Sequence, residues 1–329
     1  MPTHKKKISP LSRRNHVLLT LATFMVGGMV SACMVMSYVF IAYPQLQSSQ
    51  PAVAGAFAEQ WVAPVRLSGS AASPTITAPA GILLDVETGT IVWERNRTAV
   101  RPLASLTKLI TTSAYLATAP RLEAAYTIPA DFHTNDITNV VEPGTGVSKL
   151  DVRVGERVTY KDLLAASIIG SANNAVLALA RTAGLFAGRL QQFAVAQGAR
   201  TVQVVEGSGL AAGNVGSAQD VAVLAHTAFS NPTLREFAGQ TSYRVRTGSR
   251  SFVVQTTSEL VHDSGYTIVA AKTGFLDEAG YNLAVQAQVD GHELLLVLLG
   301  SPTSDDRFAD ADALLRWGFG AHVWQVVKS

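Results

Sequence analysis

The stretch Tyr281–Gly300, "YNLAVQAQVDGHELLLVLLG", decides the fold of this chain. Apolar residues alternate with polar ones before Asp290-Gly291 and form a nearly continuous run after it. An Asp-Gly pair between two such segments is a strong signal for a tight β-hairpin. Working outward, residues 81–96, "GILLDVETGTIVWERN", have the same form around Glu87-Thr88-Gly89. Two hairpins of this kind predict a largely antiparallel sheet.

Helices are expected between and after these hairpins. Thr159 in "TYKDLLAASII" and Ser217 in "SAQDVAVLAHTAF" are each followed three residues later by an aspartate, which is typical of a capped helix start. Residues 304–319, "SDDRFADADALLRWGF", carry acids early and then an apolar face, so they predict a last helix. Strands at both ends with helices between them indicate a mixed α/β domain.

The N-terminal part of the chain has a different character. Residues 17–43, "VLLTLATFMVGGMVSACMVMSYVFIAY", are uncharged and follow five basic residues without any acid. As a helix this run spans roughly 40 Å, enough to cross a bilayer, so we expect a transmembrane signal-anchor. Residues 1–16 are then a cytoplasmic tail, residues 44–80 a flexible linker rich in Pro, Ser, Ala and Gln, and residues 81–329 an extracytoplasmic domain at the cell membrane.

Two other interpretations of the N-terminal run stay open. A cleaved secretory signal has a shorter apolar core, of about 7–15 residues. Val30-Ser31-Ala32-Cys33 fits the small-residue pattern that precedes a lipidated bacterial cysteine, and Cys33 is the single cysteine of the chain. The apolar run continues past Cys33, where a lipoprotein usually becomes polar. Either anchor leaves the rest of the chain outside the cytoplasmic membrane.

Composition narrows the functional classes. The chain has 329 residues, 48% of them hydrophobic, which is enough for a substantial core. Beyond residue 43 there are 21 basic and 24 acidic residues without a basic block, so nothing supports a nucleic-acid partner. The seven histidines are scattered, with no His-Glu-x-x-His and no paired cysteines, so no metal or other cofactor is expected. The absence of a Gly-x-Ser-x-Gly motif argues against a histidine-dependent hydrolase.

The segment "RPLASLTKLITTSAYLA", residues 101–117, places Ser105 and Lys108 three residues apart on a helical pattern. Such a spacing puts both side chains on one face, so the lysine amine can reach the serine hydroxyl. A serine hydroxyl needs a neighbouring base to act as a nucleophile, and lysine is a base only when it is neutral. Burial and a second cation both lower a lysine pKa. One S-x-x-K is expected by chance in a chain of about this length, so the motif is weak alone.

Two further motifs follow. Ser171 and Asn173 lie in a bend between two helical stretches, "LLAASIIGSANNAVLALA", and could face one cavity or cap a helix. Lys272-Thr273-Gly274 ends the strand-like "YTIVAAKTGF" and offers a cation, a hydroxyl and a close backbone approach, which suits a carboxylate. Lys272 would also be the second cation near Lys108. The three motifs in this order are far more specific than any one of them.

On these motifs the chain from about Ala80 to Phe319 resembles the D-alanyl-D-alanine carboxypeptidases, the low-molecular-mass penicillin-binding proteins of serine peptidase family S11. The resemblance implies a penicillin-binding-protein/β-lactamase-like domain. Its five-stranded, largely antiparallel sheet has flanking helices and a helical subdomain that carries Ser171 and Asn173. It also implies removal of the terminal D-alanine from peptidoglycan stem peptides, a role in cell-wall synthesis and cell shape, and covalent inhibition by β-lactam antibiotics.

Carried over residue by residue, the resemblance makes Ser105 the acylated nucleophile, Lys108 its base and Ser171 a proton relay. It assigns substrate binding to Asn173, Lys272, Thr273, Gly274, Phe275 and Arg307, with the backbone N–H groups of Ser105 and Phe275 as the oxyanion hole. Arg307 could equally form an ion pair on a helix surface.

The sequence departs from the family at "VVEGSGLAAGNVG", which keeps only Gly209-Leu210 of the usual Asn-Pro-x-Gly-Leu, and at Leu276, where a small hydroxylic residue is frequent. These departures bear on specificity. A D,D-endopeptidase would use the same residues. A class A β-lactamase needs a glutamate for deacylation, and Glu206 lies 35 residues after Ser171 but lacks the expected Leu-Asn continuation. A catalytically silent wall-binding module is the alternative of another class.

Overall fold

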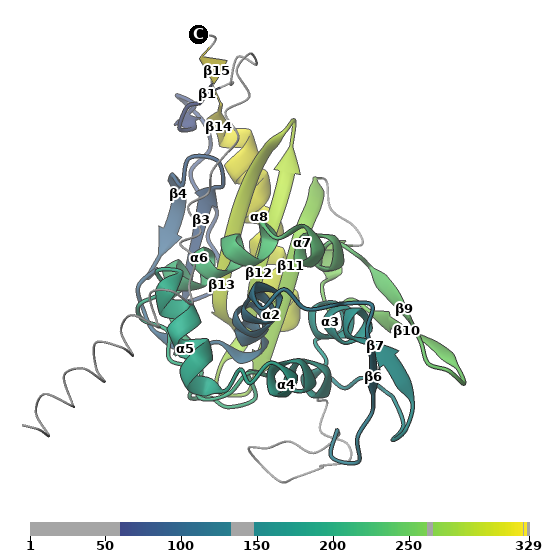
Figure 1. The fold of residues 1–329 in the computed structure, drawn as a ribbon. Helices are drawn as coiled ribbons and strands as arrows, with labels where there is room; N and C mark the ends of the chain where they lie inside the picture. The colour runs from purple at the N-terminus through teal and green to yellow at the C-terminus, as the bar shows by residue number, and fades with distance from the viewer. Residues whose placement is uncertain (1–59, 133–147, 262–265, 325, 328–329) are drawn as a thin grey trace, which may run out of the picture. The chain divides into compact units, whose positions relative to one another are not determined.

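The computed structural model describes residues 60–132, 148–261, 266–324 and 326–327. Its centre is a five-stranded antiparallel sheet (Figure 1). In spatial order the strands are β11 (Thr267–Leu276), β12 (Gly280–Val289), β13 (His292–Ser301), β3 (Ala80–Asp85) and β4 (Ile91–Arg95). The mixed α/β fold and the five-stranded sheet are therefore confirmed, and β11 is an edge strand of that sheet.

Both predicted hairpins are present. The β12–β13 turn has Asp290 at φ 50° and Gly291 at φ 84°, the left-handed pair that a two-residue hairpin turn requires. In the β3–β4 turn the Asp85 carboxylate accepts hydrogen bonds from the backbone N–H of Thr88 at 3.0 Å and from its hydroxyl at 2.5 Å. Local turn chemistry thus fixes the register of both hairpins.

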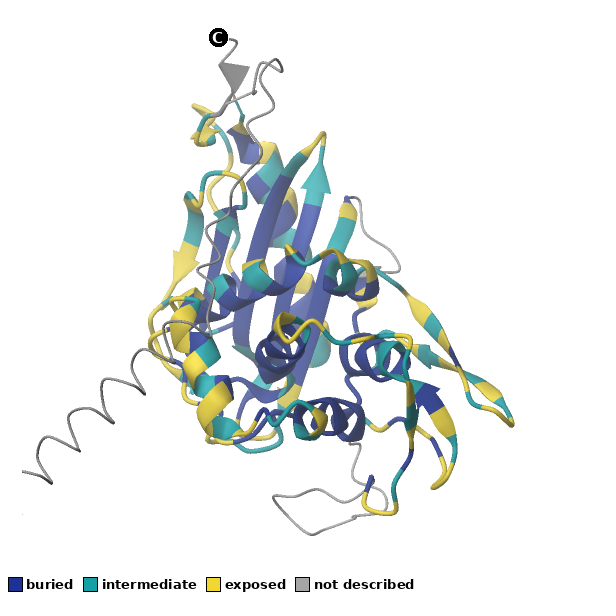
Figure 2. Cartoon of the chain, viewed as in Figure 1, coloured by how far each residue is buried: buried dark blue, intermediate teal, exposed yellow. Residues whose placement is uncertain are grey.

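The strands β12, β13 and β3 are buried on both faces over most of their length, whereas the edge strand β4 is half-buried or exposed (Figure 2). Alternate residues of β13 belong to two separate cores. One core packs against α8 (Ser304–Ala321), and the other lies beneath α2 (Thr107–Ala117) and α6 (Ala218–Phe229), which cover the opposite face (Figure 1). The first contains Leu294, Leu296 and Leu298, and the second contains Leu295, Val297 and Leu299.

The predicted helix starts are also confirmed. Thr159 and Asp162 form a reciprocal capping box, and the Ser217 hydroxyl accepts from the backbone N–H of Asp220 at 3.2 Å. The remaining described helices are η1 (Ala104–Leu106), α3 (Tyr160–Ile168), α4 (Asn173–Thr182), α5 (Ala187–Ala196), α7 (Pro232–Ala238) and η2 (Glu259–Val261).

Short strand pairs complete the described fold. Each pair is antiparallel and joins segments outside the main sheet. They are β1 (Gln60–Trp61) with β15 (Val326–Val327), β2 (Val65–Arg66) with β14 (His322–Val323), β5 (Arg101–Pro102) with β8 (Val215–Gly216), β6 (Ala125–Thr127) with β7 (Arg157–Thr159), and β9 (Ser242–Arg246) with β10 (Ser251–Gln255).

The end of the predicted linker is bound to the domain. Val65–Arg66 pairs with β14, and the Asp310 carboxylate of α8 accepts from the backbone N–H groups of Thr77 and Ala78 at 2.8–3.0 Å. The chain is therefore ordered against the domain well before residue 80, through partners more than 200 residues away. The predicted transmembrane run 17–43 lies outside the described residues. Within the described ranges, no helix combines the length and apolar character that a membrane span needs.

Candidate active site

Ser105 lies in the short 3-10 turn η1, and α2 begins only at Thr107, slightly later than the helical pattern suggested. Ala104 has φ 48°, a left-handed conformation that is strained for a residue with a side chain. Ser105 and Lys108 nevertheless remain one turn apart. The predicted pair is therefore formed by a strained turn that leads into a buried helix.

Lys108 is fully buried, with 0% of its surface exposed. Its ammonium donates to the Ser105 hydroxyl at 2.8 Å, to Oδ1 of Asn173 at 2.6 Å and to the carbonyl oxygen of Ser208 at 2.6 Å. All three acceptors are neutral. Burial lowers the pKa of Lys108 to about 7, while the nearby Glu206 carboxylate opposes that shift. A large fraction of this amine is therefore unprotonated at neutral pH.

Ser171 and Asn173 occupy the bend between α3 and α4. Ser171 has φ 57°, and Asn173 is the first residue of α4. The N-cap position belongs to Ala172, so neither side chain caps this helix. Asn173 uses its side chain to accept from Lys108 and its backbone N–H to donate to the Ser148 carbonyl at 2.9 Å. The bend thus aims both polar side chains towards the two buried lysines.

Lys272 is the second buried lysine, 1% exposed. It donates to the Ser171 hydroxyl and to the Thr273 carbonyl, both at 2.9 Å. Burial, then the charges of Lys108 and Arg307, hold the pKa of Lys272 well below its ordinary value. The sequence suggested that Lys272 would lower the pKa of Lys108. Burial is the largest cause of the lowered pKa of Lys108, and the repulsion between the two lysines disfavours protonation of both amines at once.

Gly274 brings β11 against the nucleophile turn. A Cβ atom at this position would lie 3.1 Å from both the backbone nitrogen of Ser105 and the carbonyl oxygen of Leu103. Beside it, the hydroxyls of Thr273 and Thr257 are 2.6 Å apart. A side chain at residue 274 would crowd the nucleophile turn, so glycine allows this close approach of β11 to Ser105 without displacement of either segment.

Arg307 projects from α8 to the edge of the same pocket. It is 5% exposed and donates to the carbonyls of Gly274 at 3.4 Å and Asn282 at 3.2 Å. Its guanidinium also lies over the Phe308 and Tyr281 rings, 4.3 and 5.4 Å from their centroids. Burial lowers the pKa of Arg307 to about 10, so it stays cationic at neutral pH. It is a buried, pocket-lining residue and does not lie on an exposed helix surface.

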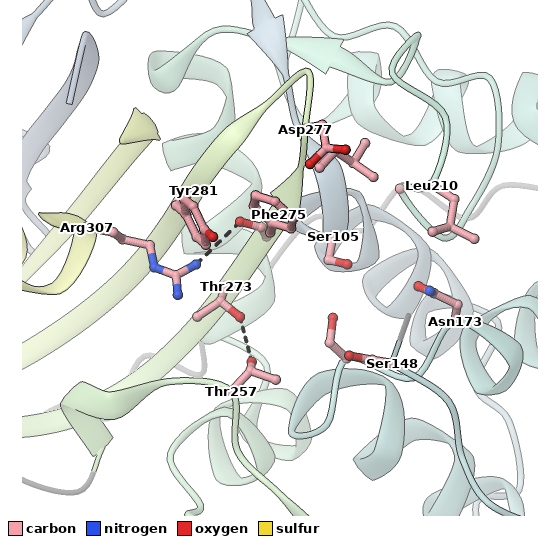
Figure 3. Close-up of a pocket in the computed structure, with 14 residues that line it drawn as sticks. Ser105, Ser148, Asn173, Leu210, Thr257, Thr273, Phe275, Asp277, Tyr281 and Arg307 are labelled. Carbon is pink, nitrogen blue, oxygen red and sulfur yellow. Dashed lines mark hydrogen bonds between the residues drawn. The ribbon is translucent and has the colours of Figure 1, made fainter. Parts of the chain in front are cut away.

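These residues surround one pocket of about 520 Å³ (Figure 3). In Figure 3, Ser105 lies between Thr273 and Asn173, with Phe275 and Arg307 on the β11–α8 side. The lining comprises Ser105, Ser148, Ser171, Asn173, Gly209, Leu210, Thr257, Thr273, Gly274, Phe275, Leu276, Asp277, Tyr281 and Arg307. Lys108 and Lys272 lie just beneath this lining and touch it through Ser105 and Ser171.

Sequence reasoning missed several pocket residues. Ser148 and Thr257 belong to no recognisable motif and reach the pocket only through tertiary packing, whereas Asp277 and Tyr281 lie in the β11–β12 hairpin that directly follows the Lys272-Thr273-Gly274 motif. The two departures noted in the sequence, Gly209-Leu210 and Leu276, do line the pocket.

Glu206, the residue considered for deacylation in a β-lactamase, is 7% exposed and does not line the pocket. Its carboxylate accepts hydrogen bonds from its own loop, among them one from the Ser208 hydroxyl at 2.6 Å. In the described part of the chain, no three His, Cys, Asp or Glu side chains are grouped so that they could hold a metal ion.

Comparison with known proteins identifies a family and several relatives of this chain. Residues 68–303 match the family described as D-alanyl-D-alanine carboxypeptidase. A D-alanyl-D-alanine endopeptidase of Pseudomonas aeruginosa is 27% identical over 248 residues, covering 74% of this chain and 77% of that protein. The carboxypeptidase DacC of Escherichia coli is 30% identical over 261 residues, covering 75% of this chain and 62% of that protein.

Solved structures of D,D-peptidases have a fold similar to that of this chain. The DD-transpeptidase of Streptomyces K15 superimposes with a TM-score of 0.70 at 25% identity, covering 76% of this chain and 100% of that structure. A D-alanyl-D-alanine carboxypeptidase of Mycobacterium tuberculosis, at 20% identity and a TM-score of 0.69, covers 80% of this chain and 99% of that one. At that identity the second likeness concerns the fold alone.

Proposed function

The chain belongs to the D-alanyl-D-alanine carboxypeptidase family of serine peptidases, and from this premise we propose that its pocket cleaves D-alanyl-D-alanine ends of peptidoglycan stem peptides through an acyl-enzyme on Ser105. The chain is a serine-type D,D-peptidase and a penicillin-binding protein. The roles of its individual residues follow from the contacts in the pocket.

Acylation begins with the neutral amine of Lys108. It takes the proton of the Ser105 hydroxyl, 2.8 Å away, as Oγ attacks the carbonyl carbon between the two D-alanines. Negative charge develops on the carbonyl oxygen, and the backbone N–H groups of Ser105 and Phe275 are the donors we assign to it. The C–N bond then breaks, the leaving amine takes up a proton through Ser171, and water hydrolyses the ester.

The terminal carboxylate of the substrate is assigned to the Thr273 end of the pocket. Thr273 supplies a hydroxyl there, Lys272 lies directly beneath, and Arg307 adds a cation that persists at neutral pH. An incoming carboxylate favours the protonated form of Lys272, which burial and repulsion disfavour in the empty pocket. Asn173 is assigned to the substrate amide and holds Lys108 through Oδ1.

The observation that carries this proposal is the buried Lys108 amine, in contact with Ser105 and with a pKa near neutrality. Labelled penicillin tests it. One covalent equivalent on Ser105 that hydrolyses slowly is expected. Rapid, repeated hydrolysis of a chromogenic cephalosporin would favour a β-lactamase, and the absence of any adduct would favour a wall-binding module.

A D,D-endopeptidase activity is the second candidate. It is supported by the extent of the match, because the chain covers 77% of the Pseudomonas aeruginosa endopeptidase and 83% of the Escherichia coli endopeptidase, compared with 62% of the carboxypeptidase DacC. Release of D-alanine from a pentapeptide, measured beside cleavage of a crosslinked dimer, separates the two. The larger kcat/KM identifies the preferred substrate.

We also propose that residues 17–43 anchor the protein in the cell membrane, with the domain on the extracytoplasmic side. The support is the length of the uncharged run and the five basic residues before it. The full chain should resist alkaline washing of membranes and dissolve in detergent. Loss of this behaviour in Cys33→Ala would indicate a lipid anchor instead, and release of a shortened chain would indicate a cleaved signal.

A further inference from the structure

Glu206 is a buried carboxylate that the proposed mechanism does not use, and it lies near the catalytic base. Oε2 of Glu206 accepts from the backbone N–H and hydroxyl of Ser208 at 2.5 and 2.6 Å. Oε1 accepts from the N–H of Gly209 at 2.5 Å, the N–H of Ala211 at 3.3 Å and the amide of Asn214 at 2.6 Å. All five donors are neutral, and together these four N–H groups and one hydroxyl surround a single negative charge.

The loop that wraps this carboxylate is attached to the nucleophile segment. The Gly207 carbonyl accepts from the Thr111 hydroxyl of α2 at 2.8 Å. Gly209 has φ 88°, and a Cβ atom there would lie 2.0 Å from the Ala104 carbonyl oxygen, so the loop backbone touches the strained turn directly. The Ser208 carbonyl, between these two anchors, accepts from Lys108 at 2.6 Å.

We infer that Glu206 is a positioning residue for the catalytic base: its carboxylate folds residues 206–211 so that the Ser208 carbonyl holds the Lys108 amine against Ser105. The inference rests on the proposed function, because it concerns the base of that reaction. Glu206 does not itself line the pocket, although it accepts from the N–H of Gly209, which does. It acts through the backbone of Ser208 and through its charge.

The negative charge of Glu206 affects the pKa of Lys108 in a known direction. A negative group near a lysine favours the ammonium form, and Glu206 raises the pKa of Lys108 against the lowering caused by burial. Without that charge the amine would lose its proton at a lower pH. Glu206 therefore keeps Lys108 near the point at which it can both accept and return a proton at neutral pH.

Two variants distinguish the effect of the Glu206 charge from its effect on the position of Lys108. Glu206→Gln keeps the size but removes the charge, and Glu206→Asp keeps the charge but shortens the side chain. The measurement is the second-order rate of penicillin acylation of the full chain, followed by intact mass from pH 5 to 9. Hydrolysis of the acyl-enzyme and the melting temperature are recorded for each protein.

In a plot of acylation rate against pH, the acid limb is the part where the rate falls as Lys108 becomes protonated. For Glu206→Gln we expect this limb to move to lower pH by about 0.5–1 pH unit. For Glu206→Asp we expect the limb to stay with the wild type while the rate falls roughly ten- to a hundredfold, because the base is displaced. A general loosening of the domain would also lower the rate at every pH, but it would lower the melting temperature of the Glu206→Asp protein as well, whereas displacement of the base alone would leave the melting temperature near that of the wild type.

Several results would overturn the inference. If Glu206→Gln folds and its acylation rate falls at the same acid pH as that of the wild type, Glu206 has no electrostatic role. If penicillin acylates Glu206→Asp at the wild-type rate, Glu206 has no positioning role. If Glu206→Gln does not fold, the rate of Glu206→Asp decides alone. Selective loss of acyl-enzyme hydrolysis with acylation intact would assign Glu206 to the deacylating water. Absence of a Ser105 adduct in the wild type would refute the proposed function itself.

Discussion

Two basic side chains in this protein have opposite surroundings. Lys108 is buried among neutral oxygens, and its pKa falls to about 7. Arg250, beside the β9–β10 hairpin, donates to the Glu156 carboxylate at 3.0 Å and to the Asp151 carboxylate at 3.2 Å, and these contacts raise its pKa. The same pairing lowers the pKa of Glu156 to about 2. A cation with anionic partners keeps its proton, whereas a buried lysine with neutral partners becomes available as a base.

The largest expected effect comes from removing the amine of Lys108. Lys108→Ala should reduce the rate of penicillin acylation roughly a hundred- to ten-thousandfold, because Ser105 loses its only adjacent base among the described contacts. The rate is measured by intact mass, and circular dichroism confirms that the domain is folded. Acylation near the wild-type rate would refute the assignment of Lys108 as base.

A matched variant sharpens the same test. Lys108→Arg keeps a positive charge but replaces the amine with a guanidinium that does not lose its proton. If Lys108 acts as a base, the arginine variant should be as slow as the alanine variant. Recovery of acylation by arginine would mean that charge alone is needed at this position.

The second effect is a pH dependence. Lys108 is neutral above its pKa and protonated below it, so the wild-type acylation rate should be high above pH 7 and fall about tenfold per pH unit below it. Acylation rates from pH 5 to 9 give the position of the limb. A profile that stays flat down to pH 5 would show that another group accepts the proton.

The third prediction concerns Lys272, the other buried lysine, which we assign to substrate binding rather than to proton transfer. Lys272→Ala should lower kcat/KM on a pentapeptide with a free terminal carboxylate by roughly ten- to a hundredfold. The same peptide with an amidated terminus should be affected much less. An equal loss on both peptides would show that Lys272 does not recognise the carboxylate.

The smallest effect is expected at the paired cation. Arg250→Ala should leave acylation within about twofold of the wild type and lower the melting temperature by only about 2–4 °C, since partly exposed ion pairs contribute little. Thermal melting at low and high salt measures this, and high salt should narrow the difference. A large loss of acylation would show that the reactivity of Ser105 depends on the contacts that Arg250 makes at the β9–β10 hairpin.

Much of the fold could be predicted from the sequence. The turn at Asp290-Gly291 and the capped helix starts at Thr159 and Ser217 are local features, and each has the structure that its pattern predicted. The docking of residues 65–78 against α8 and β14 could not be predicted, because Asp310 and Thr77 are 233 positions apart. No local pattern encodes a hydrogen bond of that range.

The residues of the candidate site also divide into those that sequence motifs could predict and those that only tertiary packing brings to the pocket. The motifs around Ser105, Ser171 and Lys272 identified the polar groups of the pocket, and the structure brings all three segments together. Thr257 and Ser148 lie in segments without any signal, although they line the same cavity. Glu206 was read as a candidate for deacylation because of its spacing from Ser171, whereas its hydrogen bonds show that it organises its own loop.

The sequence by itself determined the turns, helix starts and apolar faces, because these depend on neighbouring residues and on the periods of strand and helix. It also determined which side chains were available for chemistry. Only the tertiary structure decided that Lys108 meets a carbonyl 100 positions away and that Lys272 meets a hydroxyl 101 positions away. The reactivity of the amine follows from that packing, because a lysine loses its proton near neutral pH only when the surrounding protein excludes water and offers no anion in direct contact.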